Sequence, residues 1–390
     1  MSLWWAKREQ LDNHQVDLIE NTPLTENHLV LGPAGSGKTN VLLRRAQFVR
    51  TQGLPNVLVL TFTRPLTEFV KTGCFDDQGR EIFPQACVTT IAKWLTWMFD
   101  QHGTDLPEAG LDLVRWKKAL AIGAIDFARQ GRTPHYDTIF VDEAQDLLDE
   151  EIELIAQWSP VLFLAGDDRQ RIFAEMDGLT AVRRIVPRLM ESTLPFHYRL
   201  APEICKMADR ILTPTSGKPL SKNSHYSGPR PGTIDLSHGP MTKERQLEAA
   251  ALKLKDQIRV YSGLIQQGDR LGVIVARKED RDAVFEYFQR VPELTGKSKI
   301  IRSREEQDGD YSPSFDADAP ICIVTVQGCK GLEFRAVHWL FSEELGKYHD
   351  NEHYYTVVTR AKTSLDVYYT RELPQTLARA HAPDGGDIWG

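Results

Sequence analysis

The run GPAGSGKT, residues 32–39, has the residue types and spacing of a loop that binds phosphate groups. Glycines let backbone N–H groups curl around phosphate oxygens, and the start of the helix expected at 41–49 adds partial positive charge. In such a loop Lys38 reaches the β- and γ-phosphates, and the Thr39 hydroxyl binds Mg²⁺. An ordinary glycine-rich turn is the weaker interpretation, because an apolar run at 29–31 precedes the loop. We therefore expect ATP and Mg²⁺ as cofactors, with contacts from Gly32, Pro33, Ala34, Gly35, Ser36, Gly37, Lys38 and Thr39.

Two acidic residues follow another apolar run, in the sequence TIFVDEAQD at 138–146. An acid at a strand end can hold Mg²⁺ while its neighbour orients the attacking water, and we assign these roles to Asp142 and Glu143. Alone, such a pair is most often a solvated turn, but its position about a hundred residues after the loop favours catalysis. A third apolar run ends in GDDRQ, where Gln170 could contact both γ-phosphate and water, or simply belong to a polar turn.

Composition limits the class of protein. With 390 residues, 41% of them hydrophobic and 26% charged, the chain can form two or three globular domains. The longest apolar runs have the length of strands, so we expect no membrane span and a cytoplasmic protein. Five cysteines without a C-x-x-C pair indicate reduced thiols and no zinc site. A net charge of −7 is inconclusive about nucleic acid, because a local basic groove can exist on an acidic chain.

The elements that must position these residues fall into two α/β blocks with parallel strands and crossover helices. In the first block, strand-like runs lie at 29–31, 57–62, 138–142 and 161–166. In the second, they lie at 271–276, 321–326, 336–341 and 365–369, with a helical run at 243–265. We expect a linker or exposed loop at 211–233, a polar acidic loop at 302–320 and a flexible tail at 374–390.

Ordered motifs across about residues 10–370 resemble those of superfamily 1 helicases of the UvrD/Rep-like group. In chain order they are LDNHQ (11–15), GPAGSGKT (32–39), LTFTRPL (60–66), VDEAQD (141–146), AGDDRQRIF (165–173), LPFHYR (194–199), TVQGCKGLEF (325–334) and YYTVVTRAK (354–362). The resemblance implies an α/β fold of two RecA-like P-loop NTPase domains, with parallel sheets flanked by helices. We expect them at 1–194 and 195–373, the first with a small helical insertion at about 65–137 that has Trp94, Trp97 and Trp116 in its core.

The resemblance also implies roles for residues outside the phosphate loop. Gln15 would bracket adenine, Tyr198 would pack on it, and Glu333 would lie near the ribose. Arg199 and Arg360 would place guanidinium groups on the γ-phosphate, which stabilises the charge that develops during phosphoryl transfer. Contacts to single-stranded DNA are expected from Phe62, Thr63, Arg64, Thr90, Phe173 and Thr325, by stacking and phosphate binding.

Several departures from the family pattern affect the strand-binding motifs rather than the nucleotide motifs. After Phe173, Glu175 replaces a Trp, and an acid near a phosphate backbone repels it. Arg64, His197 and Gln327 replace the usual Asn, Asn and His. Between 290 and 320 only a short acidic segment stands where relatives carry a second large accessory domain.

Three functions remain open from the sequence. The first is an ATP-driven single-stranded DNA translocase or helicase, 3′→5′ by resemblance, with weak or partner-dependent unwinding. The second is a nucleotide-regulated subunit that controls a partner nuclease or other effector in DNA repair or phage defence. The third is an ATPase switch that binds no nucleic acid. The motifs do not distinguish DNA from RNA, and we favour the first function.

Overall fold

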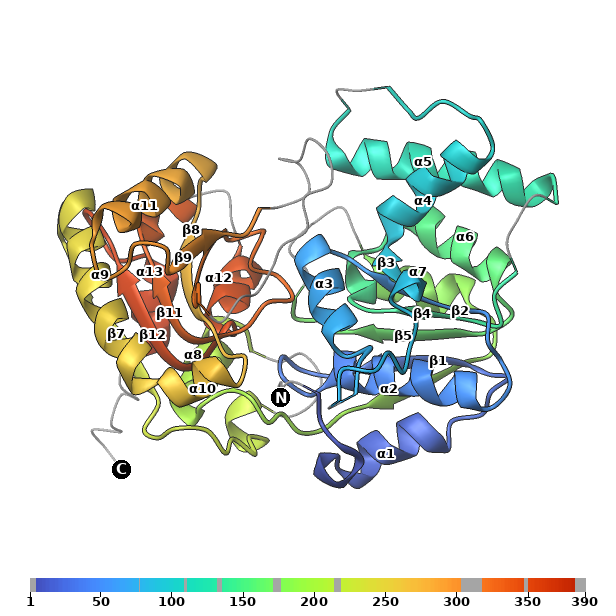
Figure 1. The fold of residues 1–390 in the computed structure, drawn as a ribbon, viewed down its shortest axis with the longest axis horizontal. Coiled ribbons are helices and arrows are strands. Elements are labelled where there is room, and N and C mark those ends of the chain that lie inside the picture. Colours follow the sequence, from blue (N-terminus) through green and yellow to red (C-terminus); the bar gives the residue numbers. More distant parts are fainter. Residues whose placement is uncertain are drawn as a thin grey trace, which may run out of the picture. The chain divides into compact units, whose positions relative to one another are not determined.

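The computed structural model describes residues 5–76, 78–108, 111–131, 135–170, 177–213, 219–302, 318–346 and 350–382. The chain divides into two compact units, Trp5–Leu194 and Pro195–Gly390, which we call the first and the second unit. Each unit has one six-stranded sheet in which every strand pair is parallel, with helices on both faces (Figure 1). This confirms the predicted fold class of two RecA-like α/β domains.

The sheet of the first unit has the strand order β3-β2-β4-β5-β1-β6. Its strands are β1 (Asn27–Leu31), β2 (Val57–Thr61), β3 (Val88–Thr90), β4 (Thr138–Val141), β5 (Leu162–Gly166) and β6 (Leu189–Thr193). Its helices are α1 (Asn13–Glu20), α2 (Lys38–Thr51), α3 (Arg64–Thr72), α4 (Ile91–Gln101), α5 (Leu113–Arg129), α6 (Asp149–Trp158) and α7 (Gly178–Ile185), with 3₁₀ turns η1 (Arg8–Gln10), η2 (Gln85–Cys87) and η3 (Ala144–Asp146).

Alternation along the strands builds two cores. Leu29, Leu58 and Ile139 pack with residues of α4–α7, whereas the next residue of each strand, Val30, Val59 and Phe140, packs with α1–α3. Because successive side chains of a strand point to opposite faces, a fully apolar strand serves both helix layers at once.

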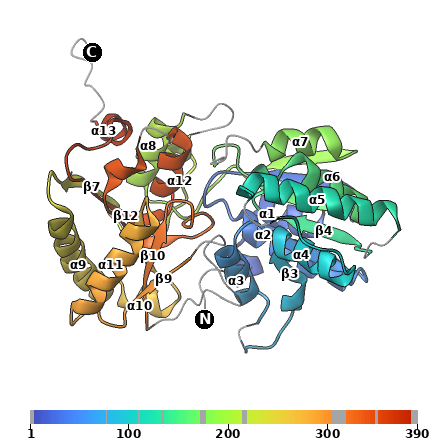
Figure 2. The ribbon, with the colours of Figure 1, turned by 90° about the horizontal axis from the view of Figure 1, so that it is seen from above.

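The sheet of the second unit has the order β7-β12-β11-β8-β10-β9. Its strands are β7 (Thr233–His238), β8 (Leu271–Val275), β9 (Ser298–Ile300), β10 (Ile321–Thr325), β11 (Phe334–Trp339) and β12 (Ala361–Tyr368). Its helices are α8 (Pro202–Ile211), α9 (Lys243–Val260), α10 (Ser262–Gln266), α11 (Lys278–Arg290), α12 (Asn351–Val358) and α13 (Gln375–His381), with 3₁₀ turns η4 (Leu220–Lys222) and η6 (Ser342–Leu345). Figure 2 shows α8, α12 and α13 on one side of this sheet and α9–α11 on the other.

Four strands are additional to the predicted ones: β3, β6, β7 and β9. All four lie at the edges of their sheets and are short or only partly buried, so none of them has the long apolar run of a central strand. Since β3 pairs with β2, the segment 65–137 is not a separate helical insertion throughout. Trp94 is buried in the core as expected, and Trp116 packs against it, but Trp97 is 49% exposed, so that prediction was wrong.

Two predicted loops are also corrected. Residues 375–381 of the expected flexible tail form α13, which buries Leu377 and Ala380 and packs against α8; residues 383–390 lie outside the described part. The 211–233 segment lies within the second unit and buries Leu220 and Tyr226, so it is neither a linker between the units nor fully exposed. No helix among the described residues is both long and apolar enough to cross a membrane.

Candidate nucleotide site and its surroundings

The phosphate loop connects β1 to α2, as its sequence predicted. Gly35 and Gly37 have φ angles of 77° and 84°, in the left-handed region that favours glycine. The Lys38 ammonium donates hydrogen bonds to the carbonyl oxygens of Gly32 at 2.7 Å and Pro33 at 3.1 Å. Lys38 is the first residue of α2, so the loop carries the helix N-terminus as well as the ammonium. Both features suit a bound anion.

Gln15 supports this loop directly. Its side-chain oxygen accepts from the backbone N–H of Asp12 at 3.1 Å, and its amide nitrogen donates to the Ser36 carbonyl at 2.9 Å. A Cβ at Gly37 would lie 2.7 Å from this nitrogen. The predicted adenine-binding glutamine is therefore buried between the α1 cap and the phosphate loop.

Thr39 and Asp142, the two predicted Mg²⁺ ligands, lie together. The Thr39 hydroxyl lies in the first turn of α2, and Asp142 directly follows β4. The hydroxyl donates a hydrogen bond to the Asp142 carboxylate at 2.7 Å. Burial, together with the neighbouring Glu143 carboxylate, raises the pKa of Asp142 to about 7. A hydroxyl and a carboxylate are oxygen ligands of the kind that Mg²⁺ prefers, so these residues fit the expected ion.

Hydrogen bonds connect Glu143 to Gln170 through the intervening residues Gln145 and Asp167. Glu143 has a φ of 56°, unusual for a residue other than glycine. Gln145 donates to the Glu143 carboxylate at 2.5 Å and accepts from the Asp167 N–H at 3.1 Å. Gln170 donates to the Asp167 carboxylate at 2.7 Å. The structure thus brings Glu143 and Gln170 into one network through Gln145 and Asp167, which the sequence reasoning had not selected although both follow strand ends.

In the second unit, Arg199 and Glu333 form an ion pair. Glu333 also lies 3.7 Å from the Lys362 ammonium, which binds Asp269 at 2.8 Å. Burial lowers the pKa of Lys362 to about 7, against the attraction of Asp269. Arg335 binds the same Asp269 carboxylate, so positive and negative charges alternate from the half-buried Arg199 to the buried Arg335.

Arg360 is held by its own unit. Its guanidinium donates to the carbonyl oxygens of Thr356 at 3.0 Å and Leu332 at 3.1 Å, and it is 2% exposed. Tyr198 is half-buried, with its ring 5.7 Å from that of His225.

The residues predicted to contact single-stranded DNA have identifiable structural roles within the protein. Thr63 and Thr90 are the N-caps of α3 and α4, where each hydroxyl accepts a backbone N–H bond, and the Thr325 hydroxyl accepts from Gly328 at 3.2 Å. Phe62 is half-buried beside Lys117, and Arg64 begins α3. Phe173 and Glu175 lie outside the described residues.

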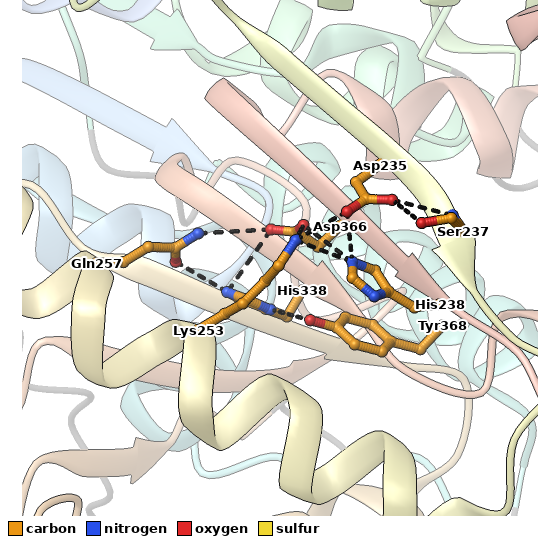
Figure 3. A network of polar contacts seen from close by, with 8 residues as sticks. All are labelled: Asp235, Ser237, His238, Lys253, Gln257, His338, Asp366 and Tyr368. Atoms are coloured by element: carbon orange, nitrogen blue, oxygen red, sulfur yellow. Dashed lines mark hydrogen bonds and ion pairs between the residues drawn. The ribbon is translucent and has the colours of Figure 1, made fainter.

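A further polar cluster, which the sequence reasoning missed, lies between α9 and the sheet of the second unit (Figure 3). The ligand atoms of Asp235, His238 and Asp366 lie within 4.8 Å of one another, a spacing that a metal ion could use. The Lys253 ammonium already contacts all three, at 2.9, 2.9 and 2.5 Å. A side-chain cation therefore neutralises these carboxylates.

Together, the parallel sheet, the phosphate loop and the carboxylates after β4 define the first unit as a P-loop nucleotide-binding domain. Residues 15–175 match a family model described as an AAA domain, which covers less than half of the chain. No curated protein matches the chain. Among matching solved structures, "The structure of PRRSV helicase" shares 13% identity at a TM-score of 0.44 and covers 90% of this chain, which spans 54% of that one. The fold and the family match are consistent with a P-loop NTPase.

Proposed function

We propose that this protein is an ATP-dependent single-stranded DNA translocase of the UvrD-like type, with 3′→5′ movement and weak or partner-dependent unwinding. The observation that carries the nucleotide part of the proposal is the bond between Thr39 and Asp142 beside the phosphate loop. The order of the helicase-like motifs supports the second part of the proposal, movement along single-stranded DNA.

The assigned chemistry is ATP hydrolysis with the first unit supplying most of the groups. Lys38 and the backbone N–H groups of 32–39 bind the phosphates, and Thr39 and Asp142 hold Mg²⁺, which would neutralise phosphate charge. Glu143 orients and deprotonates the attacking water, while Gln170 senses the γ-phosphate. Arg199 and Arg360 contribute positive charge from the second unit.

We assign the binding of single-stranded DNA to residues at the carboxyl ends of β2, β3 and β10. They are Phe62, Thr63, Arg64, Thr90 and Thr325. Backbone contacts dominate such binding, so strand affinity should fall steeply as salt rises. A flat salt response would count against this surface. The proposal places the domains at 1–194 and 195–373 and the protein in the cytoplasm.

A second candidate is a nucleotide-regulated subunit of a complex with a nuclease or effector protein. It is favoured by the contacts that both arginines make within the second unit, to Glu333 and to the Leu332 carbonyl oxygen, because arginines held in this way suit a switch. Co-purification with a nuclease, together with hydrolysis that single-stranded DNA does not change, would support this candidate over the first.

Displacement of streptavidin from end-biotinylated single strands tests the proposal. ATP-dependent displacement from the 5′ end, and not from the 3′ end, is expected for 3′→5′ movement. No displacement from either end, under conditions where ATP is hydrolysed, would contradict translocation. Lys38→Ala is the blank, and a 3′-tailed duplex in the same assay reports unwinding.

A further inference from the structure

Lys117 is a buried cation in the second turn of α5 with contacts to three segments of the first unit. Its ammonium lies 3.0 Å from the Glu151 carboxylate of α6, donates to the Asp146 backbone carbonyl at 3.3 Å and lies 4.9 Å from the centre of the Phe62 ring. The Lys117 and Glu151 side chains are only 4% and 0% exposed. Lysine is almost never this buried unless it is paired.

Stability alone is a weak reason for such a pair. Removing two charges from water costs about as much as their attraction returns, so apolar replacements of buried pairs are often neutral or stabilising. The same helix buries Leu120 and Ala124 in the apolar core. A further apolar residue at position 117 would extend that core without the cost of removing a charge from water.

The three contacted segments are the informative feature. Phe62 directly follows β2 and is expected to contact single-stranded DNA. Asp146 ends η3, the turn that follows Asp142 and Glu143 and contains Gln145. Glu151 also accepts from the Leu148 N–H at 3.0 Å, which fixes the start of α6 after that turn. One ammonium thus connects the aromatic side chain to the segment that carries the carboxylates.

We infer that Lys117 is a positioning residue that couples strand binding at Phe62 to the carboxylate segment 142–146. The inference rests on the proposed function, and Lys117 contacts neither nucleotide nor strand in it. A base that stacks on one face of Phe62 shifts the ring, the cation–π contact transmits the shift to Lys117, and the hydrogen bond passes it to Asp146.

The neighbouring residue offers a matched control. Lys118 pairs with Glu150 at 2.5 Å, so the same two helices carry a second lysine–glutamate pair one residue away. The Lys118 side chain is 52% exposed, and exposed pairs contribute little to stability. A change at this pair alters charge on the same helices without touching Phe62 or Asp146.

The test compares wild type, Lys117→Met, the double variant Lys117→Met/Glu151→Gln and the control Lys118→Met/Glu150→Gln. Lys117→Met leaves a buried carboxylate without its cation and should lower the melting temperature. The double variant removes both charges, while the glutamine still accepts from Leu148, so the melting temperature should recover. The decisive quantity is the ratio of kcat with and without saturating single-stranded DNA, taken within each variant.

We expect the double variant to lose most of the several-fold stimulation, so that its ratio falls to about one, and the control to keep the wild-type ratio. A double variant that is both stable and stimulated like wild type would overturn the inference, since Lys117 would then be structural. An equal loss in the control would overturn it too. Absence of stimulation in wild type would reject the proposed function itself, and the inference with it.

Hydrogen exchange of the wild-type protein gives an answer that needs no variant. Adding single-stranded DNA without nucleotide should change exchange at 142–151 and in α5 as well as near Phe62. Strand binding that changes exchange near Phe62 and leaves 142–151 as before would overturn the coupling.

Discussion

The nucleotide-site residues of the first unit and the arginines of the second unit differ in what they bind. In the first unit, predicted partners bind one another: Thr39 reaches Asp142, and Glu143 connects to Gln170 through two further side chains. In the second unit, Arg199 binds Glu333 and Arg360 binds backbone carbonyls. The first set is therefore already connected in the arrangement that the proposed function needs, whereas in that proposal Arg199 would have to release Glu333 before binding a phosphate.

Topology explains the difference. The strands β4, β5 and β1 are neighbours in one sheet, so the residues that follow their carboxyl ends meet at one edge. Arg199, Glu333 and Arg360 instead precede the elements α8, β11 and β12. The partners described above belong to the second unit, and they satisfy guanidinium groups that would be costly to bury without a partner.

The largest effect is expected at Lys38, the proposed cation for the phosphates in the first unit. Lys38→Ala should reduce ATP hydrolysis to background, because the β- and γ-phosphates lose their cation. Steady-state phosphate release measures this, and Lys206→Ala, an exposed lysine of α8, is the matched control. Turnover near the wild-type rate would reject the loop as the phosphate site.

Next is Arg199, which tests the second unit. Arg199→Ala should lower kcat about 10³-fold or more, since arginines on the γ-phosphate contribute effects of that size. Glu333→Gln should retain most of kcat, because it releases Arg199 without removing it. Stopped-flow and steady-state hydrolysis of both variants provide the comparison. If Glu333→Gln were as inactive as Arg199→Ala, the ion pair would be part of the active arrangement.

Glu143→Gln tests the assembled network and should lower kcat by roughly 10²–10⁴-fold, the range for general acid–base groups. The variant should still bind ATP, because Lys38, Thr39 and Asp142 are intact. A fluorescent ATP analogue measures binding and phosphate release measures turnover. Wild-type turnover would remove Glu143 from its assigned role.

The smallest effect concerns stability in the cluster of Figure 3. His338 binds Tyr368 at 2.9 Å and Gln257 at 2.8 Å, and burial lowers its pKa from 6.5 to about 4. Between these values the unfolded chain binds a proton that the folded protein does not. The free energy of unfolding should therefore fall as pH drops from about 6.5 towards 4, by up to about 1.4 kcal/mol per pH unit.

Denaturant unfolding of wild type and His338→Gln at pH 7.5, 6 and 5 isolates this contribution. The glutamine does not titrate, so the difference between the two proteins should shrink as pH falls. A constant difference across this range would show that His338 is protonated in both states or in neither.

The sequence predicted much of the fold and of the first site. Long apolar runs such as Val57–Thr61 identified the central strands, and the spacing of Lys38, Asp142 and Gln170 identified residues that one sheet edge brings together. The edge strands β6 and β9 were missed. In β6 only Thr193 is a residue type that favours strands, and no residue is fully buried, while β9 has only three residues. The α13 helix was missed because it is short and buries only Leu377 and Ala380, so its apolar pattern is weak.

Partners in the second unit were not predictable. Arg199, Glu333 and Lys362 were visible as charged residues, but nothing in their spacing indicates that they neutralise one another. Lys117 and Glu151 look like two of many charges on amphipathic helices, and only the packing of α5 on α6 shows that they are buried.

The decisive measurement for an ATP-driven motor is steady-state ATP hydrolysis with and without single-stranded DNA, with Lys38→Ala as the blank. We expect hydrolysis that Lys38→Ala abolishes and that single-stranded DNA stimulates several-fold. Hydrolysis that the strand leaves unchanged would contradict the motor and favour a nucleotide-regulated subunit. No hydrolysis above the blank would contradict the assembled nucleotide site itself.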